Sequence, residues 1–306
     1  MDEKLPPDER AALFEAQRPR LRAVAYRMLG SVSEAEDAVH EAWLRYDRTD
    51  TSDVQNLPGW LTTVVSRVCL NLLRGRELRR EEPPEAEAGE PGPARIPDPL
   101  LRREGVTDPG QEVLLGDSVG LALMVVLESL APAERIAFVL HDLFAVPFAE
   151  IAPLIERTAA ATRQLADRAR RRVQDQAPAP DPDPGRQRAA VDAFFAAARA
   201  GDLGALVAVL APGVVLRSDG GPVRARHPVV LTGAAAVADQ PVLWGGLSPF
   251  ARPALVNGAA GAVAIGEGGR PLSVMAFTVV DGAIAAIEVL TDPERLAALD
   301  LSAFRD

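Results

Sequence analysis

Cysteine, histidine and tyrosine are scarce in this sequence, and their scarcity excludes several classes of site. The chain has 306 residues, of which 1 is cysteine, 3 are histidine and 2 are tyrosine. A single cysteine cannot form an internal disulfide, so we expect Cys69, which lies in an apolar run, to fill part of a core. The histidines are too scattered to coordinate zinc together. The sequence predicts no metal site and no cofactor.

Long apolar runs are also lacking. No stretch of about 18 or more apolar residues occurs, which is the length that a membrane-spanning helix needs. The first residues, MDEKLPPDER, are acidic and have neither the basic segment nor the apolar run of a secretory signal. We therefore expect a cytoplasmic protein with no membrane partner.

Net positive charge is lacking as well, because the chain carries a formal net charge of -10. This balance disfavours nucleic-acid binding, which depends on clustered Lys and Arg. The charges are nevertheless unevenly distributed: residues 67–80 read RVCLNLLRGRELRR, and residues 163–172 read RQLADRARRR. Two basic segments in an acidic chain indicate two separate basic faces that can contact a phosphate backbone.

Periodicity divides the first half of the chain into two helical blocks. Apolar residues at three-four spacing predict three helices between residues 12 and 80. The first should end near Gly30, and Ser33 with Glu36 should form a capping box for the second. Helical spacing resumes at about residue 112, and its last two short helices, the second strongly basic, have the outline of a helix-turn-helix.

The last third of the chain has a different pattern. A Pro-rich segment over 177–186 predicts a stiff linker. Two helices and then several apolar runs follow, and the pair Asp281 and Gly282 between two such runs predicts a β-hairpin. Helices followed by an antiparallel sheet indicate an α+β domain.

The two helical blocks resemble sigma factors of the extracytoplasmic-function type, in the sigma-70 family. The segments FEAQRPRLRAVAYRMLGSVSEAEDAVHEAWLRY and LPGWLTTVVSRVCLNLLRGR resemble region two, and LAPAERIAFVLHDLFAVPFAEIAPLIERTAAATRQLADRARRRV resembles region four. The tail resembles the SnoaL-like branch of the NTF2-like cone fold, with the short motifs IPDPL, SDGG and TDPERL. A glycine is usual in the family where Glu156 stands, and a glutamine is more usual where His40 stands.

This resemblance implies a multidomain fold in which two all-α domains precede an α+β domain. The implied domains are region two over 1–80, a flexible linker over 81–111, region four with its helix-turn-helix over 112–176, a Pro-rich linker over 177–186 and a regulatory SnoaL-like domain over 187–306.

The resemblance also implies a function and its residues. The chain would bring core RNA polymerase to promoter DNA and initiate transcription, and its tail would modulate this activity. The residues that would contact polymerase are Glu36, Asp37, Glu41 and Trp43. The minus-10 element would be bound by Asn56, Arg67, Asn71, Arg74 and Arg76. The minus-35 element would be bound by Thr158, Arg163, Gln164, Arg168 and Arg171. The regulatory motifs supply Pro97, Asp98, Pro99, Asp219, Gly220, Gly221, Asp292 and Pro293.

Plainer alternatives stand beside these roles. The acidic residues of the second helix can form a solvated face with Trp43 in the core, and Arg163 can pair with Asp167 on a surface helix. The tail could instead bind a small-molecule ligand, or act as an enzyme with a carboxylate base in an apolar pocket. The candidates for that chemistry are Asp219, His227 and Glu288. Asp219 could equally sit in a turn, and Glu288 could face solvent at a sheet edge.

Overall fold

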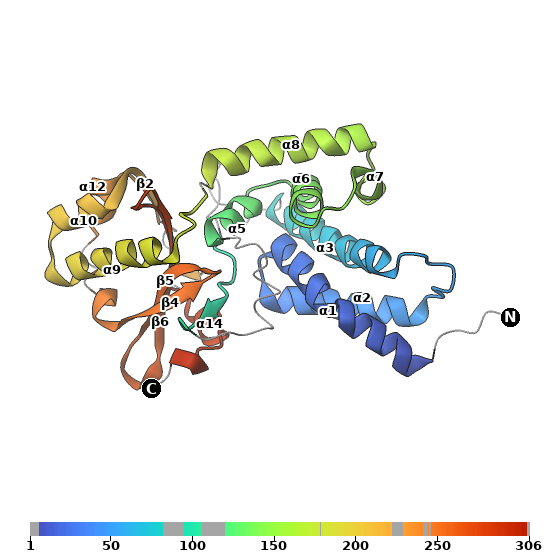
Figure 1. Ribbon diagram of the computed structural model, residues 1–306, viewed down its shortest axis with the longest axis horizontal. Helices are drawn as coiled ribbons and strands as arrows, with labels where there is room; N and C mark the ends of the chain where they lie inside the picture. The colour runs from blue at the N-terminus through green and yellow to red at the C-terminus, as the bar shows by residue number, and fades with distance from the viewer. Residues whose placement is uncertain are drawn as a thin grey trace. The chain divides into compact units, whose positions relative to one another are not determined.

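Two units make up the computed structural model of this chain, and each has its own hydrophobic core (Figure 1). The structure describes residues 6–81, 95–105, 120–177, 179–221, 229–240, 244 and 246–304. The helical unit contains the described residues 6–81 and 129–173. The sheet unit contains those of 95–105, 120–128 and 174–304. His227 lies outside the described residues.

Three helices form the first half of the helical unit: α1 (Pro7–Leu29), α2 (Val32–Arg48) and α3 (Leu57–Glu81). α1 ends where predicted, because Gly30 adopts a φ of 67° and its N–H donates to the Tyr26 carbonyl at 2.8 Å. The predicted cap of α2 is wrong: Ser31 is the last residue with extended backbone, so it is the N-cap, and Ser33 lies inside the helix. The core between the helices buries Phe14 and Tyr46 completely.

The second half of the helical unit contains the expected helix-turn-helix. Its elements are α6 (Pro132–Phe138), the π-helical turn η1 (Val139–Leu143), α7 (Phe148–Ile151) and α8 (Ala159–Gln176). Glu156 adopts a left-handed φ of 56° in the turn between α7 and α8. Thr158 is the N-cap of α8: its Oγ1 accepts a hydrogen bond from the Ala161 N–H at 3.2 Å.

Two arginines, one buried and one exposed, connect the two halves of the helical unit. Arg135 on α6 is 4 % exposed and donates to the carbonyl of Met28, at the end of α1, at 2.8 Å. Arg20 on α1 donates to the carbonyl of Phe144 at 3.3 Å, just after η1. A buried guanidinium without acceptors would be costly. These bonds therefore favour the packing of the second half on the first.

Seven strands form one sheet in the described part of the sheet unit, in the order β1-β4-β5-β6-β7-β2-β3. Their bounds are β1 (Leu101–Arg102), β2 (Leu210–Asp219), β3 (Val229–Thr232), β4 (Ala251–Val256), β5 (Ala259–Ile265), β6 (Pro271–Val280) and β7 (Ala283–Leu290). Neighbouring strands are antiparallel, except that β2 and β7 are parallel. The predicted hairpin joins β6 to β7, and Asp281 and Gly282 adopt φ values of 51° and 79°.

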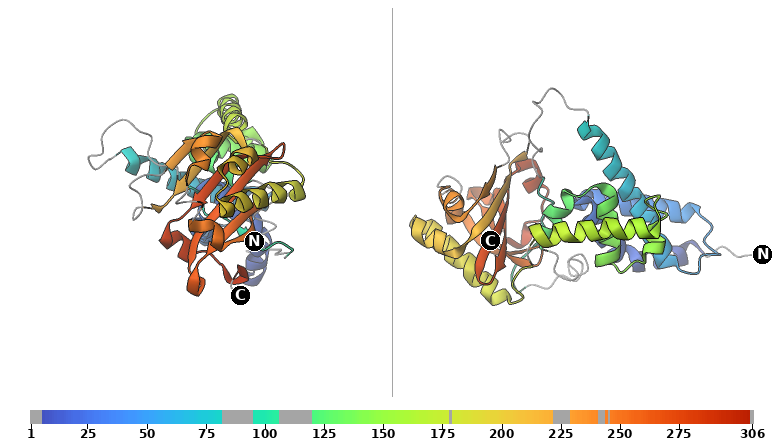
Figure 2. Two further views of the ribbon diagram at one scale, coloured as in Figure 1. Left: turned by 90° about the vertical axis from the view of Figure 1, so that its left-hand side faces the viewer. Right: turned by 90° about the horizontal axis from the view of Figure 1, so that it is seen from above.

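Helices pack against the strands of this sheet. They are α5 (Leu121–Glu128), α9 (Pro184–Ala200), α10 (Leu203–Val209), α12 (Ala234–Ala238) and α14 (Pro293–Ala297), with short 3-10 turns at η2 (Ser248–Phe250), η3 (Glu267–Gly269) and η4 (Ser302–Phe304). α9 crosses one face of the strands, as Figure 2 shows. Beneath it the Phe194 ring lies 4.9 Å from the Trp244 ring and 5.4 Å from the Phe277 ring, so aromatic side chains fill this core.

Alternation along β7 gives the sheet two distinct faces. Ile287 and Val289 belong to the aromatic core beneath α9, so Glu288 between them points to the opposite face. The expectation that Glu288 faces solvent at a sheet edge is wrong. β7 lies between β6 and β2 in the sheet interior, and the Glu288 side chain is completely buried.

Candidate promoter-binding surfaces and the linker clamp

The outer face of α3 carries three of the residues that we predicted to contact the minus-10 element. Arg67, Asn71 and Arg74 are all exposed and follow one another at three-four spacing on this helix. Arg76 does not join them. Its guanidinium pairs with Glu34 on α2 and donates to the Leu29 carbonyl at 3.1 Å, so it holds α3 against α1 and α2.

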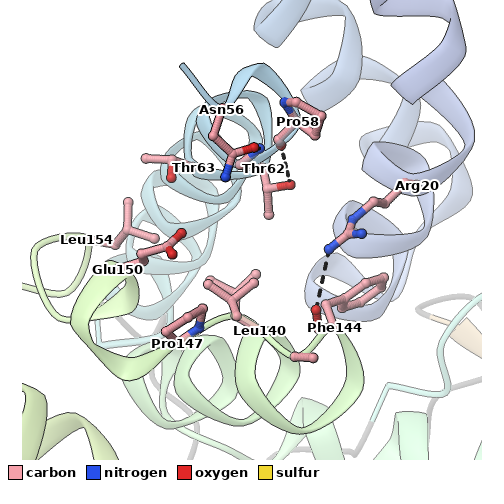
Figure 3. A pocket seen from close by; sticks show the side chains of 13 residues that line it. Arg20, Asn56, Pro58, Thr62, Thr63, Leu140, Phe144, Pro147, Glu150 and Leu154 are labelled. Atoms are coloured by element: carbon pink, nitrogen blue, oxygen red, sulfur yellow. Dashed lines mark hydrogen bonds between the residues drawn. The ribbon is translucent and has the colours of Figure 1, made fainter. Parts of the chain in front are cut away.

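Asn56 has a structural role that its sequence position did not reveal. Its Oδ1 accepts a hydrogen bond from the Gly59 N–H at 3.0 Å, which caps the start of α3. Asn56 also lines a cavity of about 240 Å³ inside the helical unit (Figure 3). The α3 side of this cavity carries Thr62 and Thr63, and Leu140 and Glu150 approach from the second half of the unit. Because Oδ1 is engaged, the Nδ2 group is the part of Asn56 that remains to donate to a base.

The outer face of α8 carries the predicted minus-35 residues. Thr158, Arg163, Gln164, Arg168 and Arg171 are all exposed. The alternative pairing of Arg163 with Asp167 is wrong, because Asp167 accepts a hydrogen bond from Arg170 at 2.6 Å instead. The exposed Arg168 side chain lies 3.3 Å from Glu134, whose side chain is largely buried. α8 therefore presents Arg163 and Gln164 side by side near its N-terminus.

The predicted polymerase-binding residues lie on α2, in different surroundings. Asp37 is exposed, whereas Glu36 pairs with Arg22, and Glu41 pairs with Arg45 at 2.9 Å. Trp43 is half-buried, and its ring packs edge-on against Phe14 with 5.1 Å between centroids. The structure thus supports a core-packing role for one side of Trp43 and leaves Asp37 at the surface of the helix.

The motifs predicted to be regulatory, far apart in the sequence, meet in the sheet unit at Arg295. The Arg295 guanidinium lies 2.7 Å from Asp98 Oδ1 and 2.8 Å from Asp219 Oδ2, and it also donates to the Ile96 carbonyl at 2.5 Å. Asp219 Oδ2 accepts a further hydrogen bond from the Ile96 N–H at 3.1 Å. We call Asp98, Asp219 and Arg295 the linker clamp. All three side chains are less than one-fifth exposed.

Several other motif residues support the clamp. Asp292 caps α14 by accepting from the Glu294 N–H at 3.0 Å, which fixes the start of the helix that carries Arg295. Gly221 has a φ of 65°, and a Cβ there would clash with the Asp292 carboxylate, so only glycine fits. Pro97 and Pro99 are buried beside the clamp. Gly220 and Pro293 lie next to these residues in the chain.

The linker segment is held at a second point. The Leu100 N–H donates to Asn257 Oδ1 at 3.0 Å, and the Asn257 N–H donates back to the Leu100 carbonyl at 2.8 Å. Asn257 and Arg295 hold this segment, and neither was among the residues predicted from the sequence. The signal for Arg295 was present, because it is the one cation in the motif TDPERL and faces two acidic motifs.

Two of the three candidate catalytic groups of the tail, Asp219 and Glu288, are engaged by an arginine. Asp219 belongs to the clamp, and Glu288 Oε1 lies 3.3 Å from Arg217. Burial raises the pKa of Glu288 to about 7, and Arg217 opposes this shift only in part. Cys69 is completely buried, which raises its pKa to about 12 and confirms it as core filling.

In the described ranges no helix is long and apolar enough to cross a membrane. Among the same residues, no group of three or more His, Cys, Asp or Glu side chains is arranged to hold a metal ion.

Comparison with known proteins gives consistent matches along most of the chain. Residues 13–79 match sigma-70 region 2, and residues 120–173 match sigma-70 region 4. The chain is 39 % identical over 298 residues to the extracytoplasmic-function (ECF) sigma factor SigJ of Mycobacterium tuberculosis, covering 92 % of this chain and 91 % of SigJ. It is 36 % identical over 299 residues to the probable ECF sigma factor SigI of the same species, covering 94 % and 95 %.

A solved structure agrees with these relatives. The crystal structure of M. tuberculosis SigJ matches with a TM-score of 0.71 and 36 % identity, covering 95 % of this chain and 99 % of SigJ. The predicted fold class is confirmed in its architecture: two helical sigma regions are followed by a domain of helices and one sheet. The chain belongs to the extracytoplasmic-function sigma factors of RNA polymerase.

Proposed function

We propose that this sigma factor uses α3 and Asn56 at the minus-10 element and α8 at the minus-35 element when it directs core RNA polymerase to promoters. One observation supports this assignment most: two exposed basic helix faces, Arg67 to Arg74 and Arg163 to Arg171, in an otherwise acidic chain. On each face the cations can hold phosphates while Asn71 or Gln164 meets a base edge. Asp37 and its neighbours on α2 are the proposed polymerase contact.

Promoter geometry requires the helical unit to open. The two elements are named for positions about 25 base pairs apart, which is about 85 Å along B-form DNA. A compact unit of about 120 residues has a radius of gyration of only about 14 Å. Both basic faces can therefore reach their elements at once only if the bonds from Arg135 to Met28 and from Arg20 to Phe144 break.

We propose that the tail modulates this opening through the linker clamp. The clamp binds the segment around Ile96 and Asp98, which lies in the chain between the two sigma regions. When the clamp holds this segment, a shorter stretch of linker can extend between region two and region four. When the clamp releases it, the whole linker can extend. The domain boundaries predicted from sequence, with a regulatory domain over 187–306, remain part of this proposal, with the addition that residues 96–102 belong structurally to the sheet unit.

Run-off transcription tests the proposed function. Purified full-length chain with core polymerase should bind and transcribe promoters selected from a randomised DNA library, whereas core polymerase alone should not. Changing Asn71 or Arg163 to Ala should reduce specific transcripts, and an exposed control, Arg199→Ala on α9, should not. Equal transcription by all four proteins would contradict the assignment. No observation favours catalysis by the tail over this function.

A further inference from the structure

Three side chains of the helix-turn-helix stack on one another at its surface. The His141 and Phe148 rings stack with 3.7 Å between centroids and 25° between planes. The Arg163 guanidinium lies over the same Phe148 ring, 5.5 Å from its centroid. The three residues come from three consecutive elements, η1, α7 and α8. Phe148 therefore connects the proposed promoter-reading helix to the helix before it.

The position of the Phe148 ring is well defined from the other side. His141 is half-buried, and its Nδ1 lies 3.0 Å from the Val146 carbonyl, which fixes the imidazole against the loop before α7. Pro147 precedes Phe148 and restricts the backbone at the start of α7. Phe148 itself is half-buried, so its ring remains available to a side chain that approaches from α8.

The contact matters because Arg163 has no stronger partner. Within the part of the chain that the structure describes, Arg163 forms no ion pair, since Asp167 is taken by Arg170. A long exposed arginine samples many rotamers, and ordering it on binding costs free energy. An aromatic face within about 6 Å attracts a guanidinium and restricts those rotamers before DNA arrives.

We infer that Phe148 is a positioning residue for Arg163: its ring orders the guanidinium for the base that Arg163 reads. The inference rests on the proposed role of Arg163 at the minus-35 element and adds a specificity determinant to it. An aliphatic side chain of similar size could fill a packing role at this position, whereas the positioning role requires an aromatic ring. Phe148 would act on base discrimination without touching DNA.

Holoenzymes assembled from core polymerase and full-length variants test this role on a promoter library randomised over the minus-35 element. Phe148→Leu should weaken the base preference read by Arg163 by about two- to five-fold, the range expected from an exposed cation–aromatic contact. Phe148→Tyr and Phe148→Trp should retain the preference, because both keep the aromatic face. Thermal unfolding of each variant measures packing separately.

A double-mutant cycle with Arg163→Ala completes the test. In the Arg163→Ala background, Phe148→Leu should have no further effect on base preference. An equal effect of Phe148→Leu in both backgrounds, or a loss by Phe148→Tyr as large as by Phe148→Leu, would overturn the positioning role while leaving Arg163 as a reader. Unchanged base preference in Arg163→Ala alone would overturn the role of Arg163 itself, and with it the inference.

Discussion

Glu156 adopts a backbone conformation that few residues with a side chain tolerate. Its φ of 56° lies in the left-handed region, which costs a non-glycine residue about 1–2 kcal/mol. Its carboxylate lies 3.9 Å from Arg74, but both side chains are exposed, so this ion pair contributes little. We expect Glu156→Gly to raise the free energy of unfolding of the helical unit by about 0.5–1 kcal/mol, after the added entropy of glycine in the unfolded chain is subtracted.

A second glutamate in the same helix pair provides the control. Glu150 is exposed inside α7, where glycine is unfavourable, so Glu150→Gly should lower the free energy of unfolding by a similar amount. Denaturant unfolding followed by circular dichroism measures both variants. Destabilisation by both glycines would show that the left-handed turn stores no relievable strain.

Glu288 makes the stability of the sheet unit depend on pH. Burial raises its folded pKa to about 7, above the ordinary value of 4.5. The folded state therefore holds a proton that the unfolded chain releases, and this contribution to stability is full below about pH 4.5 and is lost as pH rises to about 7. Protonation of Glu288 therefore contributes at most about 3 kcal/mol to the free energy of unfolding. Glu288→Gln should remove this dependence, so that thermal unfolding of the sheet unit varies less between pH 4.5 and 7.

Glu267 offers a matched control for that measurement. It is exposed in η3 of the same unit, so Glu267→Gln should leave the pH dependence as it is in the parent chain. Calorimetry at several pH values compares the three proteins. Identical slopes for the parent chain and Glu288→Gln would refute the assignment of the titration to Glu288.

At the scale of single elements, we expect different residues of α8 to determine the base specificity and the overall affinity of DNA binding. Arg163 and Arg171 are both exposed on this helix, but Arg163 lies in its first turns and Arg171 near its end. Arg163→Ala should relax preference at one base pair and cost about 1–3 kcal/mol there. Arg171→Ala should weaken all sequences alike and reduce the salt slope by about 1.

Binding of holoenzyme to matched and substituted minus-35 sequences, over a range of salt concentrations, distinguishes these outcomes. Gln174→Ala, exposed at the end of the same helix and uncharged, serves as the control. The same profile for both arginine variants would refute the division of roles along α8.

Patterns of neighbouring residues predicted where a helix ends and where a hairpin turns, whereas no local pattern predicted which distant segments come into contact. The end of α1 at Gly30 and the hairpin at Asp281 and Gly282 depend on residues adjacent in the chain, and both were predicted. The linker clamp joins Asp98 to Arg295, which are 197 positions apart, and only the fold brings them together. The sequence indicated the motifs and placed one cation, Arg295, in TDPERL, but only the fold shows which carboxylates that cation meets.

At the scale of the whole molecule, the proposed role of the linker clamp depends on the length of chain that it leaves between region two and the sheet unit. About 40 residues connect the end of α3 to the start of α5, and they can reach at most about 130 Å. When the clamp holds Ile96, only about 15 of these residues separate α3 from the sheet unit, with a reach of at most about 50 Å. The clamp thus limits how far region two can move from the body that contains the tail.

Breaking the clamp should therefore widen the range of promoter spacings that the holoenzyme accepts. Arg295→Gln removes the cation from Asp98 and Asp219, and run-off transcription from templates with successively longer and shorter spacers should then fall off less steeply than with the parent chain. Arg270→Gln, an exposed arginine of the same unit, should behave like the parent chain. Because Arg295 lies far from both basic helix faces in the sequence and on a different unit, base preference at the minus-35 element should not change in either variant. A spacer profile of Arg295→Gln that coincides with the parent profile would show that the linker segment, although bound to the tail, does not control the opening of the sigma regions.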